Sequence, residues 1–236
     1  MILFKYIIIV ALMIINGIYK KGELIKGKLT FTSGQTQEGE FYNNKLIKGK
    51  KTFSCGQIIE GEYTDGSITT GKITYSCGQI EEGEYYNEEL TKGKVTYIDG
   101  QIEQGDFEDG FLIKGKITFP DGKIKKGLFK NNELINGTLI YKGIIKKGLF
   151  KNNELINGTF TYNGTVEEGD FYNNKLIKGK RQMNGSIYEG DFNKGLIVKG
   201  TITCNGTVYN GSFNNKEQMI QGNIKFSIGK HYKDYK

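Results

Sequence analysis

The residue types that carry out catalysis are few in this sequence, and they are not arranged to act together. The only histidine, His231, lies near the C-terminal end without a partner pattern around it. Adjacent carboxylates, such as Glu81 and Glu82 or Glu167 and Glu168, would point to opposite faces of a strand and would not converge on one substrate. Motifs for metal ligands, for an activated nucleophile or for phosphate binding are absent. The sequence therefore predicts no enzyme, with no catalytic, metal-binding or cofactor-binding residues.

An aromatic residue recurs at a fixed interval and is the predicted partner-binding feature. We call it the aromatic column; its members are Tyr19, Phe41, Tyr63, Tyr85, Phe107, Phe129, Phe150, Phe171, Phe192 and Phe213. A Leu or Ile column and a second, mostly aromatic column accompany it, and all three are candidates for the core. A single-layer sheet, however, lacks a second layer to cover both of its faces. We therefore expect the aromatic column to line a groove that receives an amphipathic helix or a strand of a partner protein.

The glycines define the elements that position these columns. All 34 glycines fall on four phases of one repeat of 21–22 residues. Phase zero is the glycine two residues before each column aromatic, at Gly17, Gly39, Gly61, Gly83, Gly105, Gly127, Gly148, Gly169, Gly190 and Gly211. Five residues later stand Gly22, Gly66, Gly110 and Gly195, or in other repeats Asn44, Asn132, Asn153 and Asn174. Because Gly and Asn tolerate positive φ, this phase is predicted to be left-handed.

Each repeat reads as a β-hairpin. Residues 57–64 and 71–76 are two strand-like segments rich in Ile, Thr and Tyr. Asp-Gly or Asn-Gly pairs predict two-residue turns at 99–100, 121–122, 163–164, 184–185 and 205–206. The predicted fold is all-β: an elongated single-layer antiparallel meander of about ten hairpin repeats over residues 17–229. A hydrophobic segment, expected to be helical, precedes it at residues 1–16, and a tail follows at residues 230–236.

The repeats resemble a known family. The motifs are Glu-Gly-Glu-Phe at 38–41, Glu-Gly-Glu-Tyr at 60–63 and 82–85, and Glu-Gly-Asp-Phe at 168–171. They are similar to the Gly-x-aromatic centre of MORN repeats, over nearly the whole chain. The sequence departs from that family by lacking the second glycine of its Gly-x-Gly, at Lys51, Ile73, Val95, Ile117 and Leu139. The resemblance implies non-enzymatic assembly work: tethering membranes, organising cytoskeletal or ciliary structures, and gripping a partner helix in the groove of the sheet.

Residues 1–16 leave three interpretations open. The run Tyr6–Ile15 is wholly apolar and follows a single charge, Lys5. It is compatible with a retained membrane anchor, with a cleaved secretory signal, or with a cap folded over the first hairpin. Four lysines follow and are candidates for contact with anionic lipid: Lys20, Lys21, Lys26 and Lys28. Their excess on this side favours an anchor that keeps the repeats on the cytoplasmic or matrix side of a membrane.

Charge and cysteine content argue against two further classes of function. The net charge is +7, but residues 61–104 are acidic and Arg181 is the only arginine, so that no basic stripe for nucleic acid is predicted. Cys55 and Cys77 share a repeat phase and would lie roughly 9–10 Å apart, too far for a disulfide. With Cys204 they make three unpaired thiols, which fits a reducing compartment better than an extracellular one.

The sequence as a whole predicts a non-enzymatic scaffold that docks other proteins at a membrane, as an accessory or structural subunit of a larger assembly. A ciliary or mitochondrial complex is one such setting. One alternative is a secreted binding protein with a cleaved signal and glycans on its Asn-Gly-Ser/Thr sites, at Asn136, Asn157, Asn163, Asn184, Asn205 and Asn210. Another is a phospholipid-binding tether that uses the lysines at positions 20–28.

Overall fold

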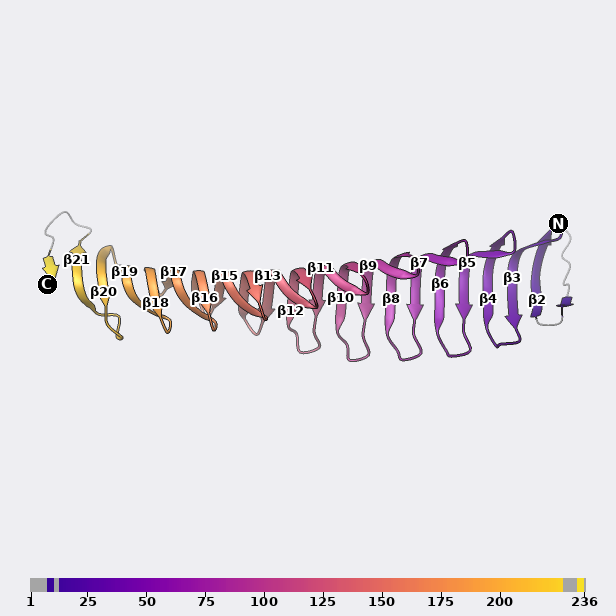
Figure 1. Cartoon of the computed structure of the whole chain (residues 1–236), viewed down its shortest axis with the longest axis horizontal. Coiled ribbons are helices and arrows are strands. Elements are labelled where there is room, and N and C mark those ends of the chain that lie inside the picture. The colour runs from indigo at the N-terminus through magenta and orange to yellow at the C-terminus, as the bar shows by residue number, and fades with distance from the viewer. Residues whose placement is uncertain (1–7, 11–12, 227–232, 236) are drawn as a thin grey trace. The chain divides into compact units, whose positions relative to one another are not determined.

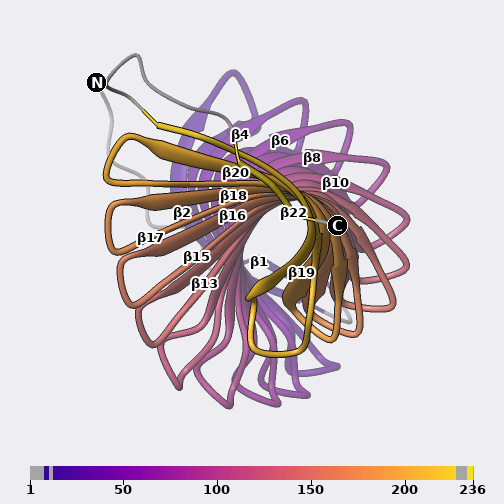
Figure 2. The same cartoon turned by 90° about the vertical axis from the view of Figure 1, so that its left-hand side faces the viewer.

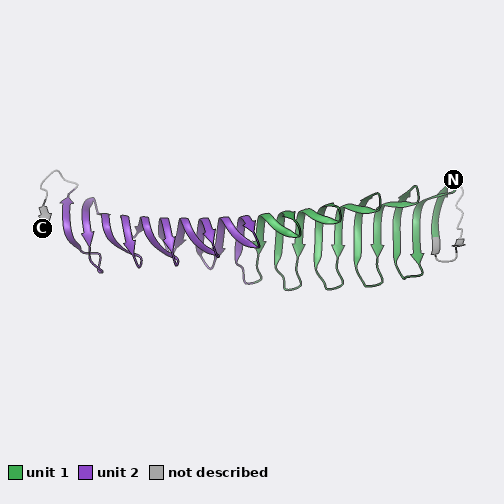
Figure 3. Ribbon diagram, in the orientation of Figure 1, with its two compact units in different colours: residues 1–120 green, residues 121–236 purple. Residues whose placement is uncertain are grey.

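The computed structural model describes residues 8–10, 13–226 and 233–235, and all regular secondary structure in them is β (Figure 1). The chain divides into two compact units, residues 1–120 and 121–236 (Figure 3). Within each unit every strand pairs antiparallel with the next strand in sequence. The predicted all-β antiparallel meander of hairpin repeats is confirmed.

Unit 1 contains five hairpins, β2–β3 to β10–β11, preceded by the short strand β1. Its strands in the described residues are β1 (Ile8–Val10), β2 (Met13–Lys20), β3 (Glu23–Phe31), β4 (Thr36–Tyr42), β5 (Lys45–Thr52), β6 (Ile58–Thr64), β7 (Ser67–Thr74), β8 (Ile80–Tyr86), β9 (Glu89–Thr96), β10 (Ile102–Glu108) and β11 (Phe111–Thr118).

Unit 2 also contains five hairpins, β12–β13 to β20–β21, followed by the short strand β22. Its strands in the described residues are β12 (Ile124–Lys130), β13 (Glu133–Tyr141), β14 (Ile144–Lys151), β15 (Glu154–Tyr162), β16 (Thr165–Tyr172), β17 (Lys175–Met183), β18 (Ser186–Asn193), β19 (Leu196–Cys204), β20 (Thr207–Phe213), β21 (Met219–Lys225) and β22 (Lys233–Tyr235).

The prediction of a helical N-terminal segment is wrong for its described part. Residues 8–10 form β1, and residues 13–16 belong to β2, so the boundary expected after residue 16 falls inside a strand. β1 pairs with β2 from Ile8 opposite Ile15 to Val10 opposite Met13. The isoleucines and valine of this segment are β-branched and favour strands, and β2 offers a sheet edge with which they pair. The described residues contain no helix of the length and apolarity that a membrane span needs. Residues 1–7 and 11–12 lie outside the described part.

Facing glycines set the geometry of every hairpin. Gly105 on β10 lies opposite Gly115 on β11 and, on its other side, opposite Gly93 on β9. A Cβ atom added to Gly105 would lie 2.0 Å from the carbonyl oxygen of Lys114 and 2.7 Å from the Cα atom of Gly115. The equivalent glycines of the other hairpins meet their partners in the same way. Only glycine permits this approach of two backbones, because the atoms that would collide belong to the main chain.

A β-bulge directly follows each glycine pair. In β10–β11 the register shifts between Asp106 and Phe107, so that Ile113 has no residue opposite it. The other nine hairpins shift at the same phase. A bulge bends its strand and increases the local twist. Successive hairpins of each unit are accordingly rotated relative to one another, as their fanned turns show in Figure 2.

The turns at nine of the ten hairpin tips, all but that of β20–β21, use two left-handed residues in succession. Asn43 and Asn44 have φ of 47° and 61°, and Asp65 and Gly66 have φ of 51° and 96°. The predicted left-handed phase five residues after phase zero is therefore confirmed. Positive φ at both central residues is the type I′ turn, whose twist matches the two strands that it joins.

The second turn of each repeat, which joins one hairpin to the next, explains the two repeat lengths. At residues 163–164, 184–185 and 205–206 both turn residues are left-handed, so the predicted two-residue turns are confirmed. At residues 99–100 and 121–122 only the glycine is left-handed, and the prediction is wrong. Tyr97 donates its N–H to the carbonyl of Gln101 over 2.9 Å, which encloses a three-residue loop. The extra loop residue makes such a repeat 22 residues long rather than 21.

The core of each unit lies on the inner face of its bent strands. In unit 2 the side chains of Leu134, Leu155, Leu176 and Ile197 are less than 2 % exposed. Each lies opposite a member of the aromatic column, as Leu134 does opposite Phe129. Burial of each such side chain is worth roughly 1.5–3 kcal/mol. The bend lets one layer of sheet cover its own apolar face.

Replacement of a paired glycine tests the role of the close backbone contact. We expect Gly105→Ala to lower the free energy of unfolding by about 3 kcal/mol, because the new methyl group meets main-chain atoms that cannot turn aside. The matched control is Gly110→Ala, where no atom lies within 4 Å of the added Cβ and only the φ of 76° is unfavourable. It should cost about 1 kcal/mol. Urea denaturation measures both, and equal losses would contradict this account of the glycine pairs.

Candidate binding surfaces

The aromatic column does not form an open groove. Nine of its ten side chains, from Phe41 to Phe213, are only 4–6 % exposed, and Tyr19 is half-buried. The expectation that this column is a partner-binding surface is therefore not met in the structure. The expectation assumed a flat sheet with uncovered faces. The hairpins are bent instead, and the bend buries the rings against the leucine column. The second aromatic column is half-buried along most of its length, from Phe31 to Cys204.

Cationic side chains on the inner face reach the tip of the following hairpin. Lys125 Nζ lies 2.8 Å from Asn153 Oδ1, and Lys146 Nζ lies 2.5 Å from Asn174 Oδ1. Lys51 donates to the carbonyl of Gly66 over 2.6 Å and lies 4.4 Å above the centre of the Tyr63 ring. Burial lowers the pKa of all three lysines. These bridges join successive hairpins and help to cover the aromatic rings.

Two adjacent hairpins carry the same buried carboxylate triad. Glu103 is 7 % exposed and accepts hydrogen bonds from Tyr97 Oη at 3.2 Å and from Gln101 Nε2 at 2.8 Å. Glu81 is held in the same way by Tyr75 and Gln79. Burial raises the pKa of Glu103, and the two hydrogen bonds oppose this rise only in part. Burial, with the nearby Glu103 carboxylate, raises the pKa of Tyr97 to about 12. The triads are internal links of unit 1.

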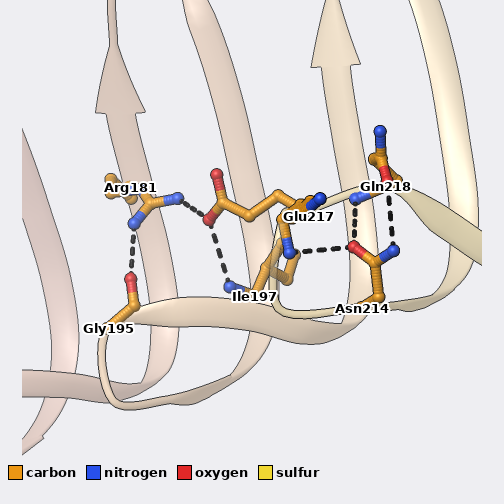
Figure 4. A network of polar contacts seen from close by, with 7 residues as sticks. Arg181, Gly195, Ile197, Asn214, Glu217 and Gln218 are labelled. Atoms are coloured by element: carbon orange, nitrogen blue, oxygen red, sulfur yellow. Dashed lines mark hydrogen bonds and ion pairs between the residues drawn. The ribbon is translucent and has the colours of Figure 1, made fainter.

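Unit 2 contains one buried ion pair, shown in Figure 4, within its described residues. The guanidinium of Arg181 binds the carboxylate of Glu217 and donates to the carbonyl of Gly195 over 2.6 Å. Glu217 also accepts a hydrogen bond from the Ile197 N–H at 3.3 Å. It stands at a left-handed position, φ 56°, in the turn that begins at Asn214. The pair thus ties the β20–β21 turn to β17 and to the β18–β19 turn.

The outer face of unit 1 is a lattice of alternating charge. Strands β4, β6 and β8 carry acidic residues beside the glycine row, and β5 and β9 carry lysines. Glu40 lies opposite Lys48, which lies opposite Glu62 on the next strand. The Lys48 and Glu62 side chains form an ion pair of 3.1 Å. Such exposed pairs contribute at most about 1 kcal/mol each.

This pattern changes on the outer face of β12–β15. Leucine replaces the acidic residue at Leu128 and Leu149, and Asn136 and Asn157 replace the facing lysines. The leucines are 43 % and 45 % exposed. We call the resulting patch the Lys–Leu surface; it consists of Lys126, Leu128, Lys130, Ile140, Ile145, Lys147, Leu149 and Lys151, all exposed and all on one face of the sheet.

The Lys–Leu surface was missed by the sequence analysis, although the sequence contains its signal. Residues 125–138 and 146–159 are identical, Lys-Lys-Gly-Leu-Phe-Lys-Asn-Asn-Glu-Leu-Ile-Asn-Gly-Thr in both. The column one residue after phase zero is acidic at Glu40, Glu62, Glu84, Asp106, Asp170 and Asp191; it is apolar at Ile18 in the first repeat and at the two leucines of this duplication. The prediction of a binding surface rested on the aromatic column and did not use this second column.

The other predicted residues lie apart from this surface. Lys20, Lys21, Lys26 and Lys28 are exposed at the N-terminal end of unit 1, and Lys28 lies 3.5 Å from Glu38. The three cysteines are free. Within the described ranges no three His, Cys, Asp or Glu side chains gather as a metal site would require. His231 lies outside those ranges.

A comparison of the sequence with protein-family models and with curated proteins finds no match. The geometry of the chain is therefore the basis for its functional interpretation.

The buried carboxylate of Glu103 makes stability depend on pH. Because its pKa is raised in the folded state, its contribution is fully present below the unfolded pKa, about 4.3, and is lost as pH rises through the folded value. We expect the difference in unfolding free energy between the native protein and Glu103→Gln to fall from about pH 4 to pH 7. Urea denaturation across this range measures it. Glu108→Gln, at an exposed position of the same strand, is the control, and a pH-independent difference for Glu103→Gln would contradict the assignment.

The Arg181–Glu217 pair gives a second stability prediction. Glu217→Gln leaves a guanidinium that is 8 % exposed without its counter-charge, and should cost about 2–4 kcal/mol of unfolding free energy. Adding Arg181→Met removes the stranded charge and should restore stability to within about 1 kcal/mol of the native protein. Chemical denaturation of both variants decides the matter. A negligible loss in the single variant would show that the pair does not hold the turn.

Proposed function

We propose that this protein is a non-enzymatic repeat scaffold, of a divergent MORN type, that binds another protein through the Lys–Leu surface. The observation that carries the proposal is the replacement of the acidic lattice by exposed leucine in two successive hairpins. In the other described repeats the same column is acidic, except at Ile18 in the first repeat and Ser212 in the last. A solvated face has no need of two leucines beside two isoleucines, whereas a docking face does.

The charge around the leucines favours an acidic partner. Lys126, Lys130, Lys147 and Lys151 surround them, and the described acidic side chains of β12–β15 are Glu133 and Glu154. Both of these accept hydrogen bonds from the amides of Asn153 and Asn174 at the hairpin tips, over 3.3 Å. The four lysines thus present a local positive field that steers a negatively charged surface toward the patch.

The shape of the surface favours a protein over a lipid bilayer. Its apolar side chains are 39–45 % exposed, so more than half of each is covered by its neighbours. Side chains that enter a bilayer must project several ångströms beyond their neighbours. Ile98, which is 82 % exposed, projects in that way, but it belongs to unit 1 and is not part of the Lys–Leu surface. Attachment to a membrane through residues 1–16 remains part of the proposal.

The test is to purify the tagged, full-length protein from its own cells with lysine cross-linking and mass spectrometry. We expect one partner in near-stoichiometric amount, cross-linked at Lys126, Lys130, Lys147 or Lys151. Leu128→Glu/Leu149→Glu should reduce its recovery by at least about tenfold, because two buried leucines are lost from the interface. Glutamate at this phase is compatible with the fold, as Glu40 and Glu62 show.

The control is Ser212→Glu, which adds a carboxylate at the same phase on β20, outside the Lys–Leu surface. It should leave recovery unchanged. A protein without a stoichiometric partner, or a partner retained by the double variant, would overturn the proposal. Glycans at Asn136 and Asn157, which are exposed beside the leucines, would instead support the secreted alternative.

A further inference from the structure

The duplicated segment presents the same groups twice on alternate strands, and we propose that both copies bind one acidic amphipathic α-helix that crosses β12–β15. This inference rests on the proposed function and names the structure and charge of the partner segment. It concerns the outer face of the sheet, whereas the groove expected from the sequence lay on the aromatic column.

The spacing of the leucines matches a helical repeat. Leu128 lies opposite Asn136, Asn136 opposite Leu149, and Leu149 opposite Asn157. The two leucines are therefore two strand spacings apart, roughly 9.6 Å. Residues i and i+7 of an α-helix are separated by about 10.5 Å along its axis. A helix perpendicular to the strands can thus place equivalent apolar residues against both leucines.

The lysines flank the leucine row on both sides. Lys126 and Lys130 stand two residues to either side of Leu128, about 6.8 Å along the strand, and Lys147 and Lys151 do the same for Leu149. A helix with its side chains is about 10–12 Å wide. Carboxylates along both edges of its apolar stripe would then lie above the two lysine rows, while Asn136 leaves room for an apolar side chain between the leucines.

The same geometry limits the length of the bound segment. The helical and strand repeats differ by about 0.9 Å over two strands, so the match is lost over a longer array. On β16 the column returns to Glu168 and Asp170, which repel an acidic helix. Four strands span roughly 14 Å between the outer two, so one helix of about 14 residues covers the surface with a turn to spare.

The test uses designed, fluorescently labelled peptides and the full-length protein. The probe has leucines at helical positions i, i+3 and i+7, with glutamates on both edges of the stripe. One control peptide has the same composition in an order that destroys the stripe, and another has lysine in place of glutamate. Fluorescence anisotropy should show binding of the probe that weakens with added salt, and at least about tenfold weaker binding of both controls.

Variants of the protein test the use of both copies. Leu128→Glu and Leu149→Glu should each weaken binding of the probe about tenfold, and the double variant more, while Ser212→Glu should not change it. Circular dichroism should show added helix when probe and protein are mixed. Equal binding of the scrambled peptide, or loss from only one of the two leucine variants, would overturn the inference.

Failure of this inference is distinguishable from failure of the proposed function. If a native partner cross-links to the Lys–Leu surface but the acidic helical probe does not bind, docking stands and the helical partner is wrong. If neither occurs, both are wrong. Binding to vesicles of phosphatidylcholine and phosphatidylserine that depends on Leu128 and Leu149, without binding of the probe, would identify the surface as a lipid-binding face and would overturn both proposals.

Discussion

The close approach of facing glycine backbones is the contact on which each unit depends. At these positions the backbones of two neighbouring strands come nearer than any side chain would allow. The bulge after each glycine pair bends the strands. The bend brings the aromatic and leucine columns together on the inner face. One sheet layer can therefore bury its rings without a second layer, which ordinary domains require. A methyl group added to a glycine of this row would push the two strands apart at the place where the core begins.

The bend also separates the two faces by role. Several polar groups that point inward are bound within the unit, either in the tyrosine–carboxylate triads or in the cationic bridges to the next hairpin. Their hydrogen bonds offset the cost of burial. The outer face lies in water and is set by cross-strand charge in unit 1. Because the inner face is occupied by the protein's own core, the outer face is the one on which we propose that a partner binds, at Leu128 and Leu149.

The sequence predicted the fold well because it repeats. Glycine phases gave the hairpins, and Gly66 or Asn44 marked the left-handed turns. It failed where a residue's role depends on three-dimensional bending. Phe107 and its equivalents were predicted to be accessible to a partner. The period of a sequence shows which side chains share a face of the sheet, but it does not show whether the sheet bends and buries them. Residues 8–10 and 13–16 were predicted to be helical. A continuous apolar run has no period that distinguishes a helix from a strand, and the strand with which it pairs lies in the next segment. The Lys–Leu surface was visible only as an exception in one column.

The identity of residues 125–138 and 146–159 has a consequence for the history of the chain. The backbone pairing between hairpins recurs at the same phases, so an inserted or deleted repeat of 21 residues finds the same pairing partners that its predecessor had. Slippage during replication, or unequal recombination between such copies, can lengthen the array without a new interface having to evolve. Two unchanged copies are what a recent event of this kind leaves behind. A second copy of a surface can thus arise in a single genetic step, with its spacing already set by the sheet.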